Sequence, residues 1–391
     1  MRQIHDLLVD LIRTPSQVAI DDSAQIVKKV TAWLDEQHVS YLIAGPTRRP
    51  SAIVINPPKH EADEVLLLNA CLDTAPVGDL AQWHHSPFAG AESNGWLYGR
   101  GSADCKAAVA IFAQLAKRER LISKAGKRLR RISIIFDCDE HSGRFGGIRA
   151  YTRRFGFPRY CAIGYPGIDR IICGSRGFYR SVVTLRGSLG HAGSGTVPNE
   201  LATDKLQRIL LALSEFSTFQ STEDSGDFPL RPRASVTWIN SGVRSFSVTP
   251  SKIECGVDLR LTPTFDPSAA LTFLEDTLDR IAKDCGNKYP SILSKPNCWP
   301  AFRTPQSALL PRLLGDAAKG ILGQTPEMAI SGPSNIGNFL AMHGTEVVAG
   351  FGVEYRNVHG PDECVRIATI DDVYGVYSQV IGAFMTMPYD G

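Results

Sequence analysis

The sequence lacks the long apolar run that a membrane span or a signal peptide requires. Charged residues recur at short intervals from the first ten positions onward, so we expect neither a secretory leader nor contact with a membrane. Net charge is also small, at +2 over 391 residues, and the basic cluster between Lys124 and Arg131 has no interleaved aromatic side chains. We therefore expect a cytoplasmic protein that does not bind nucleic acid.

Paired cysteine spacings are absent too. The nine cysteines are odd in number and scattered, so they match neither a disulfide framework nor a zinc ribbon, and most are expected to be reduced core thiols. What the chain does have is length and apolar content, with 43% hydrophobic residues. A chain of this size can bury a large core, and its length favours two domains over one.

Hydrophobic periodicity predicts an α/β fold. Two amphipathic helices open the chain, and short apolar runs at 52–55, 65–68 and 131–136 predict strands of a mainly parallel mixed sheet. Helical spacing elsewhere predicts helices that flank this sheet. These helices are expected at 106–117, 147–155, 307–322 and 370–386.

From about residue 178 the pattern changes to strand, helix, strand, strand, helix, which is the order of a small α+β, ferredoxin-like sandwich. A looser stretch at 287–304 follows, before helical spacing resumes and a strand is expected at 346–351. The middle segment therefore has the pattern of an insertion. We expect a discontinuous main domain at 1–177 and 292–391, with a lid or dimerisation domain inserted at 178–291.

Five short motifs carry chemically active side chains. They are Cys71-Leu-Asp73, Gly99-Arg-Gly-Ser-Ala-Asp104, Asp139-Glu140-His141, Tyr165-Pro166 and His359-Gly-Pro-Asp-Glu363. Carboxylates, imidazoles and thiols of this kind bind divalent ions and transfer protons, so the motifs indicate a metal-dependent catalytic site.

Further motifs follow in a familiar order. They are Gly187-Ser-Leu-Gly-His191, Asp258-Leu-Arg260 and Gly332-Pro-Ser-Asn335. With these, the sequence resembles the zinc metallopeptidase family that includes acetylornithine deacetylase, succinyl-diaminopimelate desuccinylase, aminoacylase and the glutamate-releasing carboxypeptidases such as carboxypeptidase G. The resemblance spans nearly the whole chain. It implies that the main domain is catalytic, that the substrate is small and derived from an amino acid, and that the inserted domain forms a homodimer.

The resemblance also implies roles for individual residues near the metal. Glu140 matches the general base, which takes a proton from water and passes it to the leaving nitrogen. Asp73 matches the acid that orients the ligand at position 71. Asp104 matches the carboxylate that bridges the two metal ions.

Three other residues match positions that act on the substrate. His191 matches a residue that reaches across a dimer and stabilises the developing oxyanion. Arg260 and Asn335 match positions associated with the lid and with binding of a substrate carboxylate, for which the arginine fork is suited. The alternatives to these functional roles are that His191 is an ordinary surface histidine and that Arg260 forms a structural ion pair with Asp258.

Several ligand positions depart from the family. One metal typically has a histidine where this chain has Cys71 and an acid where it has Tyr165. A thiolate binds zinc, but a phenol with a reference pKa of about 10 is a poorer ligand than a carboxylate, so we expect Tyr165 in the substrate pocket. The sequence leaves open whether Cys71 is a metal ligand or a buried core thiol.

The other metal position is chemically sound. His141 replaces a glutamate, and with Asp104 and His359 it makes a three-ligand set that leaves a position for water. We therefore expect one zinc ion rather than two. Cobalt, manganese or the absence of any metal are the alternatives.

Three functions remain open. The leading one is a metal-dependent amidohydrolase for an N-acyl amino acid or a small peptide, with a remodelled single-metal site. The second is a non-hydrolytic biosynthetic enzyme on the same fold, running a condensation or cyclisation with the metal reduced or absent. The third is a catalytically silent binding protein.

Overall fold

The structure is a computed structural model that describes residues 2–46, 50–60, 63–119, 121–125, 128–194, 200–219, 228–242 and 244–387. The chain divides into two compact units. The main unit comprises Met1–Gly174, Arg303–Ser331 and Asn335–Gly391, and the inserted unit comprises Ser175–Phe302 and Gly332–Ser334. Among the described residues, no helix has the length and apolarity to span a membrane.

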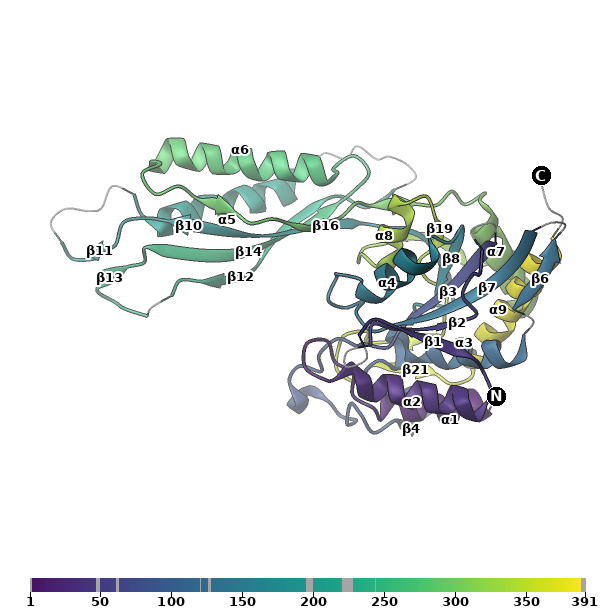
Figure 1. Cartoon of the computed structure of the whole chain (residues 1–391). Coiled ribbons are helices and arrows are strands. Elements are labelled where there is room, and N and C mark those ends of the chain that lie inside the picture. The colour runs from purple at the N-terminus through teal and green to yellow at the C-terminus, as the bar shows by residue number, and fades with distance from the viewer. Residues whose placement is uncertain are drawn as a thin grey trace. The chain divides into compact units, whose positions relative to one another are not determined.

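The main unit is built on a seven-stranded sheet with the order β1-β2-β7-β3-β8-β19, and β6 also pairs with β7 (Figure 1). The strands are β1 (Tyr41–Ala44), β2 (Ala52–Ile55), β3 (Glu64–Cys71), β6 (Ile122–Ala125), β7 (Arg128–Asp137), β8 (Tyr160–Ile163) and β19 (Glu346–Val348). The pairings of β3 with β7, of β3 with β8 and of β8 with β19 are parallel. The pairings β1–β2, β2–β7 and β6–β7 are antiparallel.

The sheet is thus evenly mixed rather than mainly parallel, which corrects the expectation from sequence. The strands β1 and β2, and likewise β6 and β7, follow one another after segments too short for the crossover helix that a parallel pairing needs. The central strands do behave as expected. Leu66, Leu67 and Leu68 of β3 are all fully buried, which shows that both faces of the strand are covered.

Helices and small sheets complete the main unit. Helix α3 packs against α1 and α9, α7 packs against α9, and α4 contacts β2 and β7. The helices are α1 (Arg2–Ile12), α2 (Ser23–Glu36), α3 (Ala107–Arg118), α4 (Gly146–Phe155), α7 (Leu309–Leu322), α8 (Ile336–Met342) and α9 (Thr369–Thr386). The shorter pieces are η1 (Leu80–Gln82), η2 (Ser102–Lys106), β4 (Ala91–Ser93), β5 (Trp96–Tyr98), β9 (Arg170–Ser175), β17 (Phe302–Arg303), β18 (Glu327–Ser331), β20 (Tyr355–Arg356) and β21 (Cys364–Arg366).

The parallel strands bring three loops to one edge of the sheet. In the register of β3 and β7, Cys71 lies opposite Asp137, so both strands end at the same level, and β8 runs in the same direction beside β3. The segments that follow these strands carry Asp73, Glu140 and Tyr165. Ligands characteristically bind beyond the carboxyl ends of parallel strands, so this edge is where a site is expected.

The inserted unit is a sheet with the order β12-β14-β10-β15, on which β16 also pairs with β10. Along the chain its elements are β10 (Gly177–Arg186), β11 (Gly190–His191), α5 (Ala202–Phe219), β12 (Arg233–Asn240), β13 (Val248–Thr249), β14 (Lys252–Leu261), α6 (Pro267–Cys285), β15 (Ile292–Leu293) and β16 (Asn297–Trp299). Its core joins Val183 and Leu259 of the sheet to Leu213 and Leu274 of the two helices. The unit therefore has a hydrophobic core of its own.

Candidate active site

Three side chains from separate motifs meet beyond the edge of the sheet. His359 Nε2 lies 2.9 Å from Asp104 Oδ2, and His141 Nε2 lies 3.6 Å from the same oxygen. The ligand atoms of all three residues lie within 4.8 Å of one another. The structure therefore brings together the one carboxylate and two imidazoles that sequence reasoning selected as a metal-ligand set.

Asp104 is positioned by Glu363. Asp104 lies in the short helical segment η2, and Glu363 Oε1 accepts the backbone N–H groups of Ala103 at 3.0 Å and Asp104 at 3.1 Å. Arg100 Nη1 donates to Glu363 Oε2 at 2.5 Å, and both of these side chains are buried. Arg100 also donates to the carbonyl oxygen of His359 at 3.0 Å, so one ion pair supports two of the candidate ligands.

Sequence reasoning missed this support. Glu363 stands in the terminal motif and Arg100 in the glycine-rich motif, but the sequence around them predicts no role for either. A buried pair between charges 263 positions apart leaves no local signal in the sequence. The signal that was present is that both residues stand close to candidate ligands within their own motifs.

Asp73 acts on the loop that follows β7. Its Oδ1 accepts the backbone N–H of Glu140 at 3.1 Å, and its Oδ2 accepts that of His141 at 2.8 Å. Asp73 Oδ2 also lies 3.3 Å from His141 Nδ1. The resemblance predicts that Asp73 orients the ligand at position 71, and the contacts that the structure gives Asp73 are with the Glu140 backbone and with the backbone and ring of His141.

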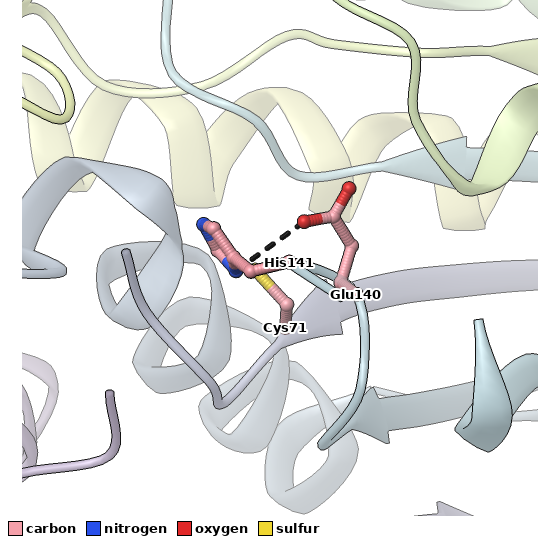
Figure 2. Close-up of side chains that lie close together, drawn as sticks. All are labelled: Cys71, Glu140 and His141. Atoms are coloured by element: carbon pink, nitrogen blue, oxygen red, sulfur yellow. Dashed lines mark ion pairs between the residues drawn. The ribbon is translucent and has the colours of Figure 1, made fainter. Parts of the chain in front are cut away.

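The His141 imidazole is buried and poorly paired. Nδ1 lies 3.3 Å from Glu140 Oε2, the ion pair drawn in Figure 2, and neither ring nitrogen has a hydrogen-bond partner among the described residues. Burial lowers the pKa of His141, but the charge of Glu140 and the close approach of the Asp104 and Asp73 carboxylates outweigh it and raise that pKa well above its ordinary value. A buried imidazole whose nitrogens lie 3.3 Å from Asp73, 3.3 Å from Glu140 and 3.6 Å from Asp104 marks an environment that favours a cation.

These donors fit a divalent ion. The two imidazoles and the Asp104 carboxylate are the ligand types that zinc takes in open, three-ligand sites. Burial alone would raise the pKa of Asp104, but His141 and His359 hold it below its ordinary value, so the carboxylate is ionised at neutral pH. His359 is half exposed, which leaves the set accessible from one side.

Glu140 and Tyr165 form a second pair next to this set. The Tyr165 hydroxyl donates to Glu140 Oε1 at 2.6 Å. Burial, opposed by His141 and reinforced by the charges of Asp104 and Asp73, raises the pKa of Glu140 to about 7. A carboxyl group poised near neutral pH can both accept and release a proton, as general acid–base catalysis requires.

Tyr165 does not fit the role of a metal ligand. Its hydroxyl is committed to Glu140, and burial together with the Glu140 charge raises its pKa well above the ordinary value. A phenolate is therefore disfavoured at this position. The family's first metal position, which would combine Asp104 with the residues at 71 and 165, is not reproduced with these side chains.

Cys71 lies at the end of β3 (Figure 2) and is buried. Its Sγ is 3.6 Å from Asp104 Oδ1 and 3.1 Å from the Sγ of Cys105. Burial, the bond to Cys105 and nearby carboxylates raise the pKa of the Cys71 thiol well above its ordinary value. Sequence reasoning did not single out Cys105, which neighbours Asp104 directly in the chain.

Three other predicted residues have local partners of their own. His191 is exposed on β11 of the inserted unit and accepts the backbone N–H of Gly193 through Nδ1 at 3.0 Å. Arg260, also in the inserted unit, forms an ion pair with Asp258 at 2.8 Å. Asn335 caps helix α8, where its side chain accepts the N–H of Gly337 at 2.8 Å.

Comparisons with known proteins agree with the fold and with the motifs. The profile of peptidase family M20/M25/M40 matches residues 67–383, and the chain belongs to this family. It is 26% identical over 389 residues to a succinyl-diaminopimelate desuccinylase of Psychrobacter arcticus, covering 96% of this chain and 93% of that protein. A second succinyl-diaminopimelate desuccinylase, from Gluconobacter oxydans, is 29% identical over 316 residues, covering 78% of this chain and 77% of its own length.

Solved structures show the same fold. The M20 family metallo-carboxypeptidase of Sulfolobus solfataricus superposes with a TM-score of 0.78 at 16% identity, covering 99% of this chain and all of that one. Human carnosine dipeptidase 1 superposes with a TM-score of 0.72 at 15% identity, covering 99% and 96%. By its family match, the protein is therefore an enzyme of the metallopeptidase class.

Proposed function

We propose that this enzyme hydrolyses the amide bond of an N-acyl amino acid or a small peptide. Asp104, His141 and His359 would hold one zinc ion, and Glu140 would be the general base. The observation that carries the proposal is the position of Glu140, whose carboxylate lies 3.3 Å from one candidate ligand and is held by the Tyr165 hydroxyl at 2.6 Å. A base beside a three-ligand site is the arrangement that water-mediated hydrolysis requires.

The protein's own side chains have separate roles in the proposed reaction. A bound divalent ion would supply a water of lowered pKa and would polarise the substrate carbonyl. Tyr165 fixes Oε1 of Glu140, so that the carboxylate keeps one orientation. Glu140 takes the proton of the attacking water and hands it to the leaving nitrogen, and its pKa of about 7 suits both transfers. Asp73 fixes the backbone that carries Glu140 and His141.

The groups proposed to act on the substrate are His191 and Arg260 of the inserted unit and Asn335 of the main unit. Without its short strands β11, β13 and β16, the inserted unit has the order β-α-β-β-α-β, which supports a ferredoxin-like lid. We assign Arg260 to a substrate carboxylate and His191 to the developing oxyanion. The ion pair of Arg260 with Asp258 engages its Nε atom. Asn335, as the cap of α8, would shape the pocket through the start of that helix.

Metal removal tests the proposal. Protein reconstituted with zinc is expected to bind about one ion at the three-ligand site and to hydrolyse members of a panel of N-acetyl and N-succinyl amino acids and dipeptides. Treatment with a chelator should abolish that activity, and added zinc or cobalt should restore it. If calorimetry detects no binding of zinc or cobalt to the metal-free protein, the proposed mechanism is wrong.

A non-hydrolytic reaction is the second candidate. The observation that favours it is the changed pair of ligand positions, Cys71 and Tyr165, of which Tyr165 now bonds the general base. Mass spectrometry of the products with an added amine acceptor distinguishes the two reactions. A condensation product in excess of free acid would identify an acyl-transfer enzyme, and free acid alone would identify a hydrolase.

The edge of the inserted sheet supports the proposed homodimer. Strand β12 is an edge strand, and it exposes Trp238 (45%) and Ile239 (48%), while the neighbouring helix α5 exposes Leu211 (53%). Exposed apolar side chains on the outermost strand of a sheet favour association with another surface, and a second copy offers the same surface.

Substituting that edge tests the dimer. Light scattering is expected to report a dimer for the unmodified chain and a monomer for Ile239→Lys. Leu80→Lys, at an exposed apolar position of the main unit, is the control and should remain dimeric.

Mixed dimers of His191→Ala and Glu140→Gln should recover activity if His191 serves the partner's site, and no recovery would contradict the shared site.

A further inference from the structure

The loop between β7 and α4 carries both Glu140 and His141, so the contacts that fix this loop also fix the proposed base and one proposed ligand. The loop runs from the end of β7 at Asp137 to the start of α4 at Gly146. Asp73 holds its middle, through the backbone N–H groups of Glu140 and His141. The two ends of the loop have a separate support, to which the proposed function assigns no role.

Asp137 connects three segments at the end of β7. Its side chain has no exposed surface. Oδ1 accepts the backbone N–H of Asp139 at 2.8 Å, and Oδ2 accepts that of Ile148 in α4 at 2.5 Å. The carbonyl oxygen of Asp137 accepts the backbone N–H of Leu72, in the loop after β3, at 2.6 Å. A carboxyl group is costly to bury unless donors surround it, so these backbone contacts hold the side chain in one geometry.

Helix α4 receives its N-terminal hydrogen bonds from this loop. Phe145 occupies the N-cap position, and its side chain makes no capping bond. Asp139 Oδ2 accepts the N–H of Gly146 at 3.1 Å, and Asp137 accepts that of Ile148. The first N–H groups of a helix have no partner within the helix and carry partial positive charge, so carboxylates stabilise this end. The helix and the loop are therefore joined through the same two side chains.

Two glycines allow this close approach. A Cβ atom at Gly147 would lie 2.4 Å from Cγ of Asp137 and 2.5 Å from the carbonyl oxygen of Ser51. A Cβ atom at Gly146 would lie 2.5 Å from Oδ2 of Asp139. Any other residue at these two positions would push the carboxylates away from the helix.

We propose that Asp137, together with Asp139, positions the loop for the reaction by fixing the backbone from which Glu140 and His141 project. The inference rests on the proposed function for the roles of those two side chains. Asp73 bonds the middle of the loop directly, whereas Asp137 and Asp139 hold its ends against β7 and α4. Misplacing a catalytic group by about 1 Å can lower a rate by about 100-fold, so a small shift of this backbone has a large effect.

Asp137→Asn tests this role with little change in side-chain size. The amide nitrogen must face one of the two backbone N–H groups, so one hydrogen bond is lost and two donors oppose each other. In zinc-reconstituted protein, kcat should fall by about 10- to 100-fold while KM changes by less than about twofold, because no proposed substrate-binding residue lies in the loop. Calorimetry should show weaker zinc binding, because His141 lies in the loop. Amide hydrogen exchange over residues 138–148 should become faster.

Asp22→Ala is the matched control. Asp22 caps α2 in the same unit, where its side chain accepts the N–H of Ala24 at 2.9 Å, and α2 carries none of the proposed site residues. This variant should lose stability in urea, and exchange should rise at the start of α2 instead. Its kcat, zinc affinity and exchange over residues 138–148 should stay at the values of the unmodified chain.

Asp139→Asn is the second variant, which keeps the proposal testable if Asp137→Asn does not fold. It removes an acceptor from the Gly146 N–H alone and should show the same pattern with a smaller loss. If the folded variants keep their kcat and zinc affinity, or if Asp22→Ala loses them equally, the two carboxylates serve the fold alone and the proposal is overturned.

Hydrogen exchange separates this proposal from the proposed function. If the unmodified chain neither binds zinc nor hydrolyses an amide, the proposed function is wrong, and exchange at the Glu140 and His141 amides decides the role of Asp137. Faster exchange there in Asp137→Asn, with no change in Asp22→Ala, would show that Asp137 holds the loop. Unchanged exchange at these amides would overturn the proposal whether or not the enzyme is active.

Discussion

Glu140→Gln is expected to lower kcat by about 10²- to 10⁴-fold, the usual contribution of a positioned general base. The amide keeps the size of the side chain and can still meet the Tyr165 hydroxyl, but it cannot accept the proton of the attacking water. Steady-state kinetics on the best substrate of the acyl-amino acid panel measure the loss. Zinc content, measured on the same preparation, should stay at the level of the unmodified protein, because Glu140 is not one of the three proposed ligands.

Tyr165→Phe is the companion variant. The Tyr165 hydroxyl stabilises the charged carboxylate, so its removal raises the pKa of Glu140 above its value of about 7. The base is active when deprotonated, so the acid limb of the kcat/KM profile should move to higher pH while activity at alkaline pH is retained. If Glu140→Gln retains full activity, or if Tyr165→Phe loses its metal, the roles assigned here are wrong.

The central strands and the helices around them follow from local patterns. Strand β2 has the bounds expected from its apolar run, and β7 (Arg128–Asp137) begins three residues before the expected 131–136 and ends one residue after it. Such runs are fixed by burial on both faces, which the residue types alone reveal. Local patterns do not predict which strands of the sheet pair parallel and which pair antiparallel. It depends on which strands become neighbours, and β2 pairs with β7, which lies more than 70 positions later.

In the candidate site, too, local sequence patterns predicted some features, whereas others depend on residues far apart in the chain. Asp104, His141 and His359 were selected because each is a good ligand type within a recognisable motif, and the structure brings their donor atoms together. Contacts that depend on side-chain direction were not predictable in this way. Three such contacts depend on how the loops run in three dimensions. They are the hydrogen bond of Tyr165 to Glu140, the contact between Cys105 and Cys71, and the contact between Asp73 and His141.

Glu363→Ala is expected to have the largest effect on stability. Arg100 would be left buried without its partner, and breaking such a pair costs about 3 to 5 kcal/mol of unfolding free energy. The backbone N–H groups of Ala103 and Asp104 would also lose their acceptor, so Asp104 should be less well positioned. Loss of such support typically weakens metal affinity by about 10- to 100-fold. Urea unfolding and zinc calorimetry measure the two effects separately.

Glu64→Ala separates a positioning role from a merely structural one. Glu64 pairs with Arg130 at 2.9 Å in the same unit, both side chains are largely buried, and neither belongs to the candidate site. This variant should therefore be destabilised while its zinc affinity stays unchanged. If Glu363→Ala also loses stability without losing zinc affinity, the Arg100–Glu363 pair serves the fold alone. A loss of affinity confined to Glu363→Ala would instead show that this buried ion pair holds Asp104 in place for the metal, so that one interaction maintains both the fold and the site.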